Sequence, residues 1–505
     1  MSLRHWKDAV TAKCNLALMQ LSLLLGLILG CALVVHVARY WRPFGFAASV
    51  GATILLVWAV QGATTETIDL FGVSFTLQPL ARDYLLIGFA LSGLLAIATS
   101  FGETRRTLGF LFWSWIAWLV ALCVDGFVVG VFAWATGLAA LVLAMEPRRA
   151  QRVGGAAYFL VLIIVASAML LLGNRFIQLY PLTPDQVTLV DSAILFFTWG
   201  LGLLLAIVPF MLWLGPMADE TPLPIIAMLL GLGQPIGFWL LYELIGQYPR
   251  LLEQSNLLTI FTYGGIGAIV IGGLLCAFER RAGRLMSFAA LYALGFVLLD
   301  FSRGTLEGTA YGVIETFARA LSLSVIAASI AIARTKSQRW LNALAILIFI
   351  FGALNLVGLV PGISLATRWN LLLELEATDR RLFFVVMLAT VGVLIGTARF
   401  VMLWIETIAN PPVSESDDSF TASPLAPRGI RQRLRAQVTR IVEQLTQRVP
   451  TPLQRTVRGI EQNWTTVFAT MLLLLFGALV LWYGNTPNLW LQRTLETVEQ
   501  LAFLR

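Results

Sequence analysis

Long uninterrupted apolar runs recur along the chain and restrict its fold more than any other feature. These runs of about 18 residues or more contain few charged residues, and short polar segments separate them. About 20 residues of helix cross a hydrocarbon core of ~30 Å, and a bilayer admits only helices or closed barrels because each backbone N–H and C=O must be paired internally. The runs are continuous rather than alternating, which favours helices over barrel strands. The sequence therefore predicts an all-α polytopic integral membrane protein.

We expect about 14 transmembrane helices, some of them broken. They are predicted at residues 16–38, 44–62, 83–101, 108–125, 127–145, 154–173, 190–213, 222–246, 257–278, 285–302, 309–333, 340–360, 382–406 and 465–483. The first run is long for a signal sequence and lacks a clear small-residue cleavage site, so we expect a retained helix. Four parts are predicted: N-terminal helices (1–79), a transmembrane core (80–409), a cytoplasmic linker with a surface helix (410–463), and a last helix with a tail (464–505).

Composition excludes several classes of function. Of the 505 residues, 58% are hydrophobic and only 12% are charged, too few charges to keep the surface of a soluble protein of this length hydrated. The net charge of +7 comes from loops, so we expect contact with lipid rather than nucleic acid. Four scattered cysteines and two histidines near the N-terminus predict neither a metal site nor a cofactor. We find no nucleotide-binding loop and no nucleophile–base set, so we expect no catalytic centre in this chain.

The positions of the basic residues predict the orientation in the membrane. They follow odd-numbered spans at Arg39, Arg42, Arg105, Arg106, Arg148, Arg149, Arg152, Arg280, Arg281, Arg284, Arg334, Lys336 and Arg339. The positive-inside rule makes that side cytoplasmic and places both termini on the opposite side, although Arg4, Arg380 and Arg381 run against the trend. We expect a multi-pass protein of a bacterial inner (plasma) membrane.

The segment before the last span differs in character. Residues 410–427 are rich in Pro, Ser and Asp and predict a flexible linker. Residues 428–449 then place apolar side chains at helical spacing opposite several arginines. This pattern predicts a basic amphipathic helix, which either lies on anionic lipid or packs on the cytoplasmic face of its own protein.

Prolines cluster between residues 201 and 248, in AIVPFMLWLGPMADETPLPIIAMLLGLGQPIGFWLLYELIGQYP. Pro209 lies near the end of one helix, and Pro222 and Pro224 open the next, which predicts a broken, kinked pair. Pro235 lies inside the second helix and frees a carbonyl group at membrane depth. Interrupted helices at that depth often line ion sites in transporters.

The same stretch resembles the antiporter-like subunits of respiratory complex I and the related Mrp-type cation/proton antiporters. Those subunits carry a PFHxWLPDA…APxPVSA segment, which is matched here by Pro209, Phe210, Trp213, Leu214, Pro216, Ala218, Pro222 and Pro224. Residues 278–299, 310–326 and 355–372 are similar to three later family segments in the same order. The resemblance covers roughly residues 80–405 and implies a core of fourteen helices.

Most ionisable positions that the resemblance associates with proton transfer are altered in this chain. A glutamate, two lysines and two histidines of the family fall on Ala135, Leu204, Gln234, Met211 and Ala293. Charge remains at Arg368, at the family's twelfth-helix position, and at Glu315 and Arg319. The last two residues lie four apart in an order that favours an ion pair within one helix.

Five further acids lie in or near the spans: Asp83, Asp125, Asp191, Glu243 and Asp300. We add Glu243 as a candidate for an ion path, because ionisable groups inside membranes are costly unless they are paired or functional. We expect Asp125, Asp191 and Asp300, which border loops, to lie among lipid headgroups.

These replacements leave two functional hypotheses. A proton relay needs groups whose pKa burial can move, and arginine, glutamine, leucine and alanine do not supply them. The first hypothesis is a non-catalytic membrane-arm subunit of a complex I-like NADH (or other donor):quinone oxidoreductase, with proton translocation weakened or lost and other membrane subunits as partners. The alternative is a stand-alone secondary ion or proton transporter with its site at the broken helices.

Overall fold

A computed structural model describes the helical core of the chain. The residues described are 22–39, 42–63, 67–70, 73–100, 107–145, 154–183, 186, 188–248, 251, 257–333, 339–359, 363–409, 470–475, 477–479 and 487–498. The linker and basic amphipathic helix predicted at 410–463 lie outside the described residues, so both remain predictions.

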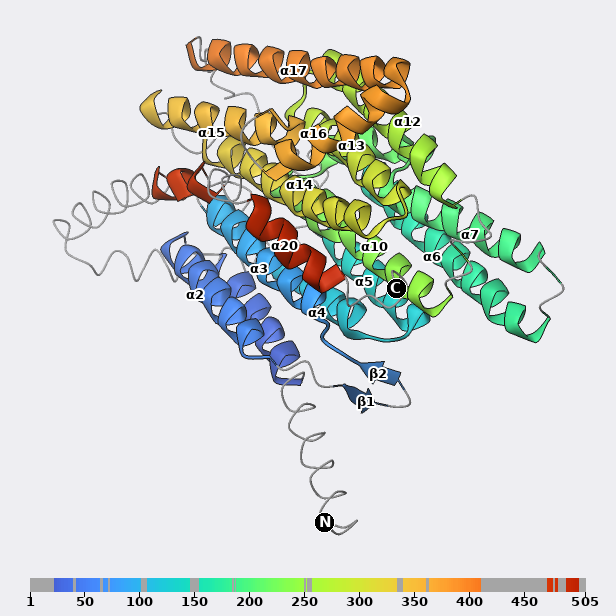
Figure 1. The fold of residues 1–505 in the computed structure, drawn as a ribbon. Helices are drawn as coiled ribbons and strands as arrows, with labels where there is room; N and C mark the ends of the chain where they lie inside the picture. Colours follow the sequence, from blue (N-terminus) through green and yellow to red (C-terminus); the bar gives the residue numbers. More distant parts are fainter. Residues whose placement is uncertain are drawn as a thin grey trace, which may run out of the picture.

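Nearly all of the described chain is helical, and the protein is a multi-pass α-helical membrane protein (Figure 1). Ten of the described helices are long and apolar enough to cross a bilayer, and four shorter apolar helices accompany them. Between residues 42 and 205 the helices are α2 (Arg42–Gln61), α3 (Pro79–Ser100), α4 (Phe110–Cys123), α5 (Phe127–Val142), α6 (Gly155–Leu179) and α7 (Thr188–Leu205). Later helices are α8 (Leu214–Glu220), α9 (Leu223–Ala227), α10 (Gln234–Gln247), α12 (Leu257–Phe278), α13 (Ala282–Ser302), α14 (Leu306–Ala333), α15 (Arg339–Val357), α16 (Ile363–Thr378), α17 (Arg380–Ala409) and α20 (Pro487–Val498).

A small β-hairpin, which the sequence analysis did not predict, covers one end of the bundle. Its strands are β1 (Ile68–Leu70) and β2 (Val73–Phe75), which pair antiparallel. The backbone after β2 joins the turn between α4 and α5, where the Thr76 amide donates to the Cys123 carbonyl at 2.6 Å and the Asp125 amide to the Ser74 carbonyl at 2.8 Å. The hairpin therefore fixes the α4–α5 turn, and Figure 1 shows both strands at this end of the molecule.

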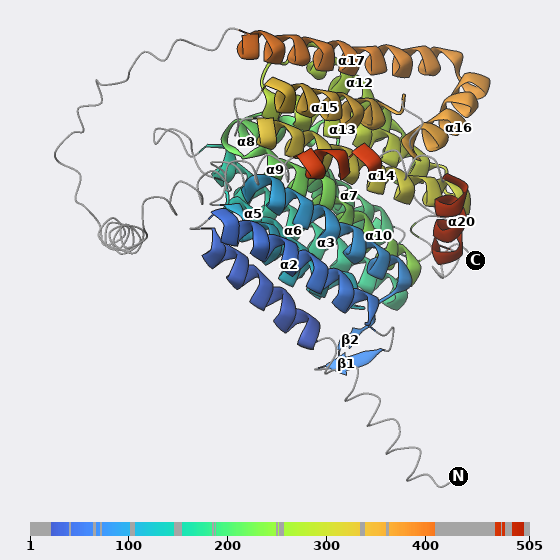
Figure 2. The ribbon, with the colours of Figure 1, turned by 90° about the vertical axis from the view of Figure 1, so that its left-hand side faces the viewer.

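The most buried segments are α14 and the continuous run from α9 to α10. Every residue from Leu223 to Phe238 is buried, and almost all of α14 is buried as well. Figures 1 and 2 show α14 surrounded by α3, α13, α15 and α16, with α20 lying against it. The side chains of Gln234 in α10 and of Glu315 and Arg319 in α14 are therefore shielded from lipid and from water.

Small residues allow the later helices to approach closely. A Cβ atom on Gly265 would meet the Gly295 carbonyl oxygen at 2.8 Å, which brings α12 against α13. On the other side of α12, Gly273 faces the backbone of α17 at Ala389, and Gly392 returns the contact. Because lipid tails are as apolar as leucine, such close backbone packing is a main source of helix association in membranes.

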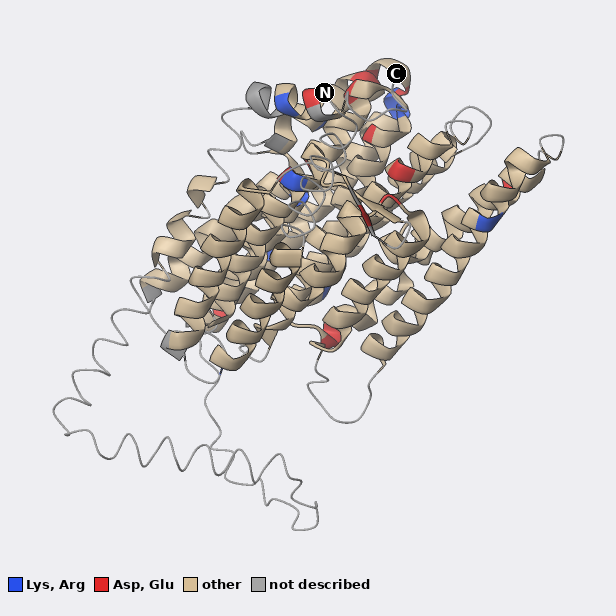
Figure 3. Cartoon of the chain, turned by 90° about the horizontal axis from the view of Figure 1, so that it is seen from below, with Lys and Arg blue, Asp and Glu red and all other residues tan. Residues whose placement is uncertain are grey.

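Ion pairs and caps join helices at their ends. Asp219 in α8 accepts from Arg284 Nε of α13 at 2.9 Å, and Glu220 accepts from the Gly155 and Ala156 amides at 3.0 and 3.1 Å, which caps α6. Figure 3 shows that most of the helical surface carries no charge. Exposed apolar side chains are frequent on α17, including Phe384, Leu388 and Met402, as a surface facing lipid or a membrane partner requires.

Candidate functional site

The first helix break separates α7 from α8 at residues 206–209. Ala206 takes a positive φ of 59°, and the Ile207 amide donates to the Gly202 carbonyl at 2.9 Å, which ends α7. A short 3₁₀ turn, η3 (Phe210–Trp213), then leads into α8. Pro209 lies at this break, as predicted from the sequence.

Side chains satisfy the carbonyl groups that the break leaves open. Trp213 Nε1 donates to the Leu203 carbonyl at 2.8 Å, and Gln234 Nε2 donates to the Leu204 carbonyl at 3.2 Å. Buried backbone groups without partners are costly in a bilayer, so these two contacts are what make the break tolerable. Gln234 thus acts first as a cap for α7.

Pro235 follows a stretch of π-helix and does not interrupt its helix. Pro222 and Pro224 open α9, which continues through η4 (Met228–Gly233), a π-helical segment, into α10. Wider helical turns before a proline expose carbonyl oxygens. Trp134 Nε1 donates to the Gly233 carbonyl at 2.7 Å, and the Tyr84 hydroxyl donates to the Leu232 carbonyl.

A second break, which the sequence analysis did not identify, separates α15 from α16. Gly358 has a φ of 80°, its amide donates to Asn355 O, and the Leu359 amide donates to Leu354 O, both at 3.0 Å. This pairing is the Schellman arrangement, which favours glycine at the left-handed position. The segment GLVPG carries a glycine and a proline at this point and could have indicated the break.

Arg319 in α14 reaches the first break through Gln234. Its Nη2 atom donates to Gln234 Oε1 at 2.5 Å, and both side chains are buried. The amide of Gln234 therefore accepts from a guanidinium on one side and donates to the end of α7 on the other.

Glu315, one turn earlier in α14, reaches the second break through Arg368 of α16. Arg368 donates to Glu315 Oε1 through Nε at 2.8 Å and also through Nη2, and Thr367 Oγ1 donates to Glu315 Oε2 at 3.0 Å. The Arg368 guanidinium lies 4.2 Å from the centre of the Phe296 ring, a cation–π contact from α13. This ion pair is buried.

The expected ion pair between Glu315 and Arg319 is wrong. Among the described residues, the ion pair of Glu315 is with Arg368, and Arg319 bonds to Gln234. A guanidinium approaching from α16 can present two donors to one carboxylate, whereas two residues of one helix turn meet only at their ends. Gln234, Glu315, Arg319 and Arg368 thus form one buried set, called here the central cluster, that connects both helix breaks.

Asp300 corrects another expectation. The sequence predicts a position among headgroups at the end of a span, but the Asp300 side chain is fully buried in α13. Neither carboxyl oxygen has a hydrogen-bond partner among the described residues. Its place in VLLDFS gave no signal that separates a buried acid from one at a helix end.

Glu243 lies apart from the central cluster, toward the end of α10. Its two carboxyl oxygens have no hydrogen-bond partner within the part of the chain that the structure describes. The nearby acid is Asp125, in the turn between α4 and α5. Partial burial raises the pKa of the Asp125 carboxyl, against the hydrogen bond from Thr76, which lowers it. This region is acidic and is separate from the arginines of the central cluster.

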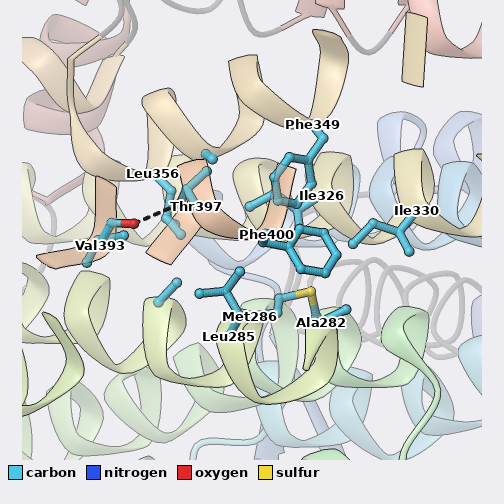
Figure 4. Close-up of a pocket in the computed structure, with 12 residues that line it drawn as sticks. Ala282, Leu285, Met286, Ile326, Ile330, Phe349, Leu356, Val393, Thr397 and Phe400 are labelled. Atoms are coloured by element: carbon cyan, nitrogen blue, oxygen red, sulfur yellow. Dashed lines mark hydrogen bonds between the residues drawn. The ribbon is translucent and has the colours of Figure 1, made fainter. Parts of the chain in front are cut away.

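Two cavities of the described chain differ in polarity. One of about 40 Å³ lies beside Pro235 and is lined in part by the hydroxyl-bearing Tyr84, Tyr242 and Thr316. It has volume for a few water molecules, because one water needs roughly 10–15 Å³. The other, of about 20 Å³, is lined by apolar groups around Phe349 and Phe400, and its hydroxyl, on Thr397, is bonded to Val393 O at 2.8 Å (Figure 4). The second cavity offers nothing to hold an ion.

The central cluster can hold charge but is poorly suited to relaying protons. Arginine stays protonated in proteins and glutamine does not titrate, so Glu315 is the one member able to exchange a proton. That carboxylate accepts three hydrogen bonds from Thr367 and Arg368 of α16, which tie it to that helix. The geometry therefore favours a fixed electrostatic clamp between the two broken helices.

Comparison of sequences finds relatives among respiratory enzymes, although no protein-family model matches the chain. NADH-quinone oxidoreductase subunit N of Desulforudis audaxviator is 23% identical over 338 residues, which cover 60% of this chain and 66% of that protein. NADH-ubiquinone oxidoreductase chain 2 of Oenothera berteroana is 26% identical over 161 residues, or 31% of this chain. The match spans only 32% of the length of that plant relative.

Comparison of folds extends the similarity to almost the whole chain. A chain of respiratory complex I from Thermus thermophilus superposes with a TM-score of 0.65 at 16% identity, covering 95% of this chain and 100% of that one. A chain of the archaeal membrane-bound sulfane sulfur reductase gives 0.68 at 14% identity, covering 96% and 99%. A chain of the Mrp complex from Dietzia sp. gives 0.62 at 17% identity, covering 75% and 47%. The chain is a divergent relative of the antiporter-like membrane subunits of respiratory complex I, and it shares its fold with a chain of an Mrp complex.

Proposed function

We propose that this chain is a membrane-arm subunit of a complex I-like donor:quinone oxidoreductase, in which it connects neighbouring membrane subunits. The observation that supports this proposal best is the sequence similarity to subunit N, together with a fold that superposes on the full length of a chain of complex I. The exposed apolar flank on α17 suits a neighbour within a membrane arm. The chain itself carries no catalytic role in this proposal.

We further propose that proton translocation through this chain is weakened or lost. The central cluster supports this, because guanidinium and amide groups stand where a relay would need titratable amines. The Glu315–Arg368 pair then serves to hold α14 against α16 across the second helix break. The other candidate, Glu243, is separated from this pair and has Asp125 as its acidic neighbour.

The proposed location is a bacterial inner membrane, with both termini on the non-cytoplasmic side and residues 410–463 in the cytoplasm. Charge supports this orientation. The ends of α8 and α13 that carry Asp219, Arg281 and Arg284 lie together, as two loops on one side of a membrane must.

One observation favours a stand-alone transporter as the second candidate. The central cluster connects the two helix breaks, and broken helices with buried charges form the binding sites of many secondary transporters. In that case Arg319 and Gln234 would contact an anionic solute or a coupling ion.

Purification of the tagged full chain from native membranes in mild detergent separates the two candidates. Mass spectrometry should find membrane and peripheral subunits of a complex I type in fixed ratio with the chain. A tagged unrelated membrane protein from the same cells serves as the control. Recovery of the chain alone, or as a homo-oligomer, would refute the subunit proposal and favour the transporter.

Loss of proton transfer is tested on the purified assembly in liposomes. If the chain conducts no protons, Arg368→Gln should leave the ratio of protons moved to electrons transferred unchanged. A fall in that ratio while the assembly stays intact would show that this chain contributes to pumping.

A further inference from the structure

Asp300 is a buried acid that the proposed clamp does not use. Its side chain is fully buried, and neither oxygen has a hydrogen-bond partner among the described residues. An isolated carboxylate inside a membrane protein costs several kcal/mol, so such a group calls for a specific explanation.

Asp300 lies between two arginine contacts on one face of α13. Phe296, four residues earlier, packs under the guanidinium of Arg368, and Arg303, three residues later, forms an ion pair with Glu374 of α16. Residues three and four apart share a helix face, and their Cβ atoms are about 5–6 Å apart. Asp300 thus lies on α13 between the contact with the central cluster and the Arg303–Glu374 pair.

The Arg303–Glu374 pair leads to the surface. The Arg303 side chain is 14% exposed and that of Glu374 is 57% exposed. The pair lies at the end of α13, on the side that the charge pattern predicts to be non-cytoplasmic. One turn of helix therefore separates Asp300 from groups that reach water or headgroups.

Charged and titratable groups of α10, α13, α14 and α16 surround Asp300. The groups that interact electrostatically with it are Arg303 on its own helix, Glu315 on α14, Arg368 and Glu374 on α16, and Tyr242 on α10. Together with Arg319, three cations then face three carboxylates, so the set is neutral when Asp300 is ionised. When Asp300 is protonated, the set gains one positive charge but no longer buries a carboxylate without donors.

We propose that Asp300 is a buried proton-exchange site, which takes up a proton from and returns it to the non-cytoplasmic surface past the Arg303–Glu374 pair. In the step, water at the surface supplies a proton that ends on a carboxylate oxygen of Asp300, and the reverse step releases it. This inference rests on the proposed function: Asp300 would be the remaining part of a proton path that no longer continues past the Glu315–Arg368 pair. The protonation of Asp300 itself does not depend on partner subunits.

Infrared difference spectroscopy of the full chain in native-lipid membranes tests this directly. A protonated carboxyl group has its own C=O stretching band, which disappears on ionisation and shifts in D₂O. We expect a band that changes with pH, shifts when D₂O replaces water, and vanishes in the isosteric Asp300→Asn variant. The control Asp191→Asn removes an exposed acid at the start of α7 and should leave the band unchanged.

Two variants keep the result interpretable. Asp300→Glu retains a carboxyl group and should retain a displaced band, which excludes misfolding as the reason for a loss in Asp300→Asn. Glu374→Gln breaks the pair at the surface and should change the rate of the D₂O shift. The proposal is overturned if no band depends on Asp300, or if its band never shifts in D₂O. Failure of co-purification would instead overturn the subunit proposal and leave this result standing.

Discussion

The Glu315–Arg368 pair offers the sharpest test of the clamp, because both partners are buried and belong to different helices. Glu315→Gln keeps the shape of the side chain and removes its charge, which leaves the Arg368 guanidinium buried without an anion to accept its hydrogen bonds. Removing one partner of a buried pair costs about 3–5 kcal/mol of unfolding free energy. Arg368→Gln should cost a similar amount, because Glu315 would lose two of the three hydrogen bonds that it accepts.

The double replacement should behave differently from the sum of its parts. Glu315→Leu with Arg368→Met exchanges the charges for apolar groups of comparable volume. Such exchanges are often neutral, or stabilising by about 1–4 kcal/mol. A double-mutant cycle should therefore give a coupling energy of several kcal/mol. Such a value indicates that each buried group is stable only when its partner is present.

Unfolding in mixed micelles of a mild detergent and SDS, followed by tryptophan fluorescence, measures these free energies. Glu374→Gln is the matched control, since it breaks an arginine–carboxylate pair that is partly exposed and worth about 0–1 kcal/mol. Single variants no more damaging than this control, or a double variant that loses the full sum, would refute the clamp.

Four smaller changes test other parts of the fold by the same unfolding assay. Gly358→Ala should lose about 1–2 kcal/mol, because a Cβ at positive φ is strained and would lie 2.8 Å from Arg368 Cδ. Ala206→Gly should gain up to about 1 kcal/mol, since Ala206 already has a positive φ. Gly273→Val should lose about 1–3 kcal/mol by forcing α12 from α17. Arg493→Ala, which removes a largely exposed ion pair from α20, should lose no more than about 1 kcal/mol.

The transmembrane class was predictable from the sequence because hydrocarbon thickness and backbone pairing leave few alternatives. The predicted spans 257–278 and 127–145 closely match α12 and α5, since apolar runs bounded by polar loops mark their own ends. The break at Pro209 was also predictable, because proline cannot continue a helix through its own position. The β-hairpin was not, since its two strands have three residues each and carry no usable periodicity.

The composition of the site was more predictable than its contacts. Each member of the central cluster could be selected as a rare ionisable or amide group in an apolar run. Their pairing depends on which helices lie side by side, and that information is not local. The predicted pair of Glu315 with Arg319 was based on their spacing alone, because opposite charges four residues apart can pair on one helix face. The buried position of Asp300 was hidden for the same reason, because its burial depends on the packing of the helices in three dimensions.

The way the two breaks are satisfied bears on why the clamp uses arginine and glutamine. Gln234 donates to the Leu204 carbonyl and at the same time accepts from Arg319. A side-chain amide can do both, because it carries an N–H donor and a C=O acceptor. A lysine there could only donate, so it would cap α7 but repel Arg319. Arg319 and Gln234 are therefore physically coupled, and a lysine introduced at residue 234 alone should destabilise the break. The same dependence predicts that Gln234→Lys is rescued when Arg319 is changed to a neutral residue of similar length, such as methionine.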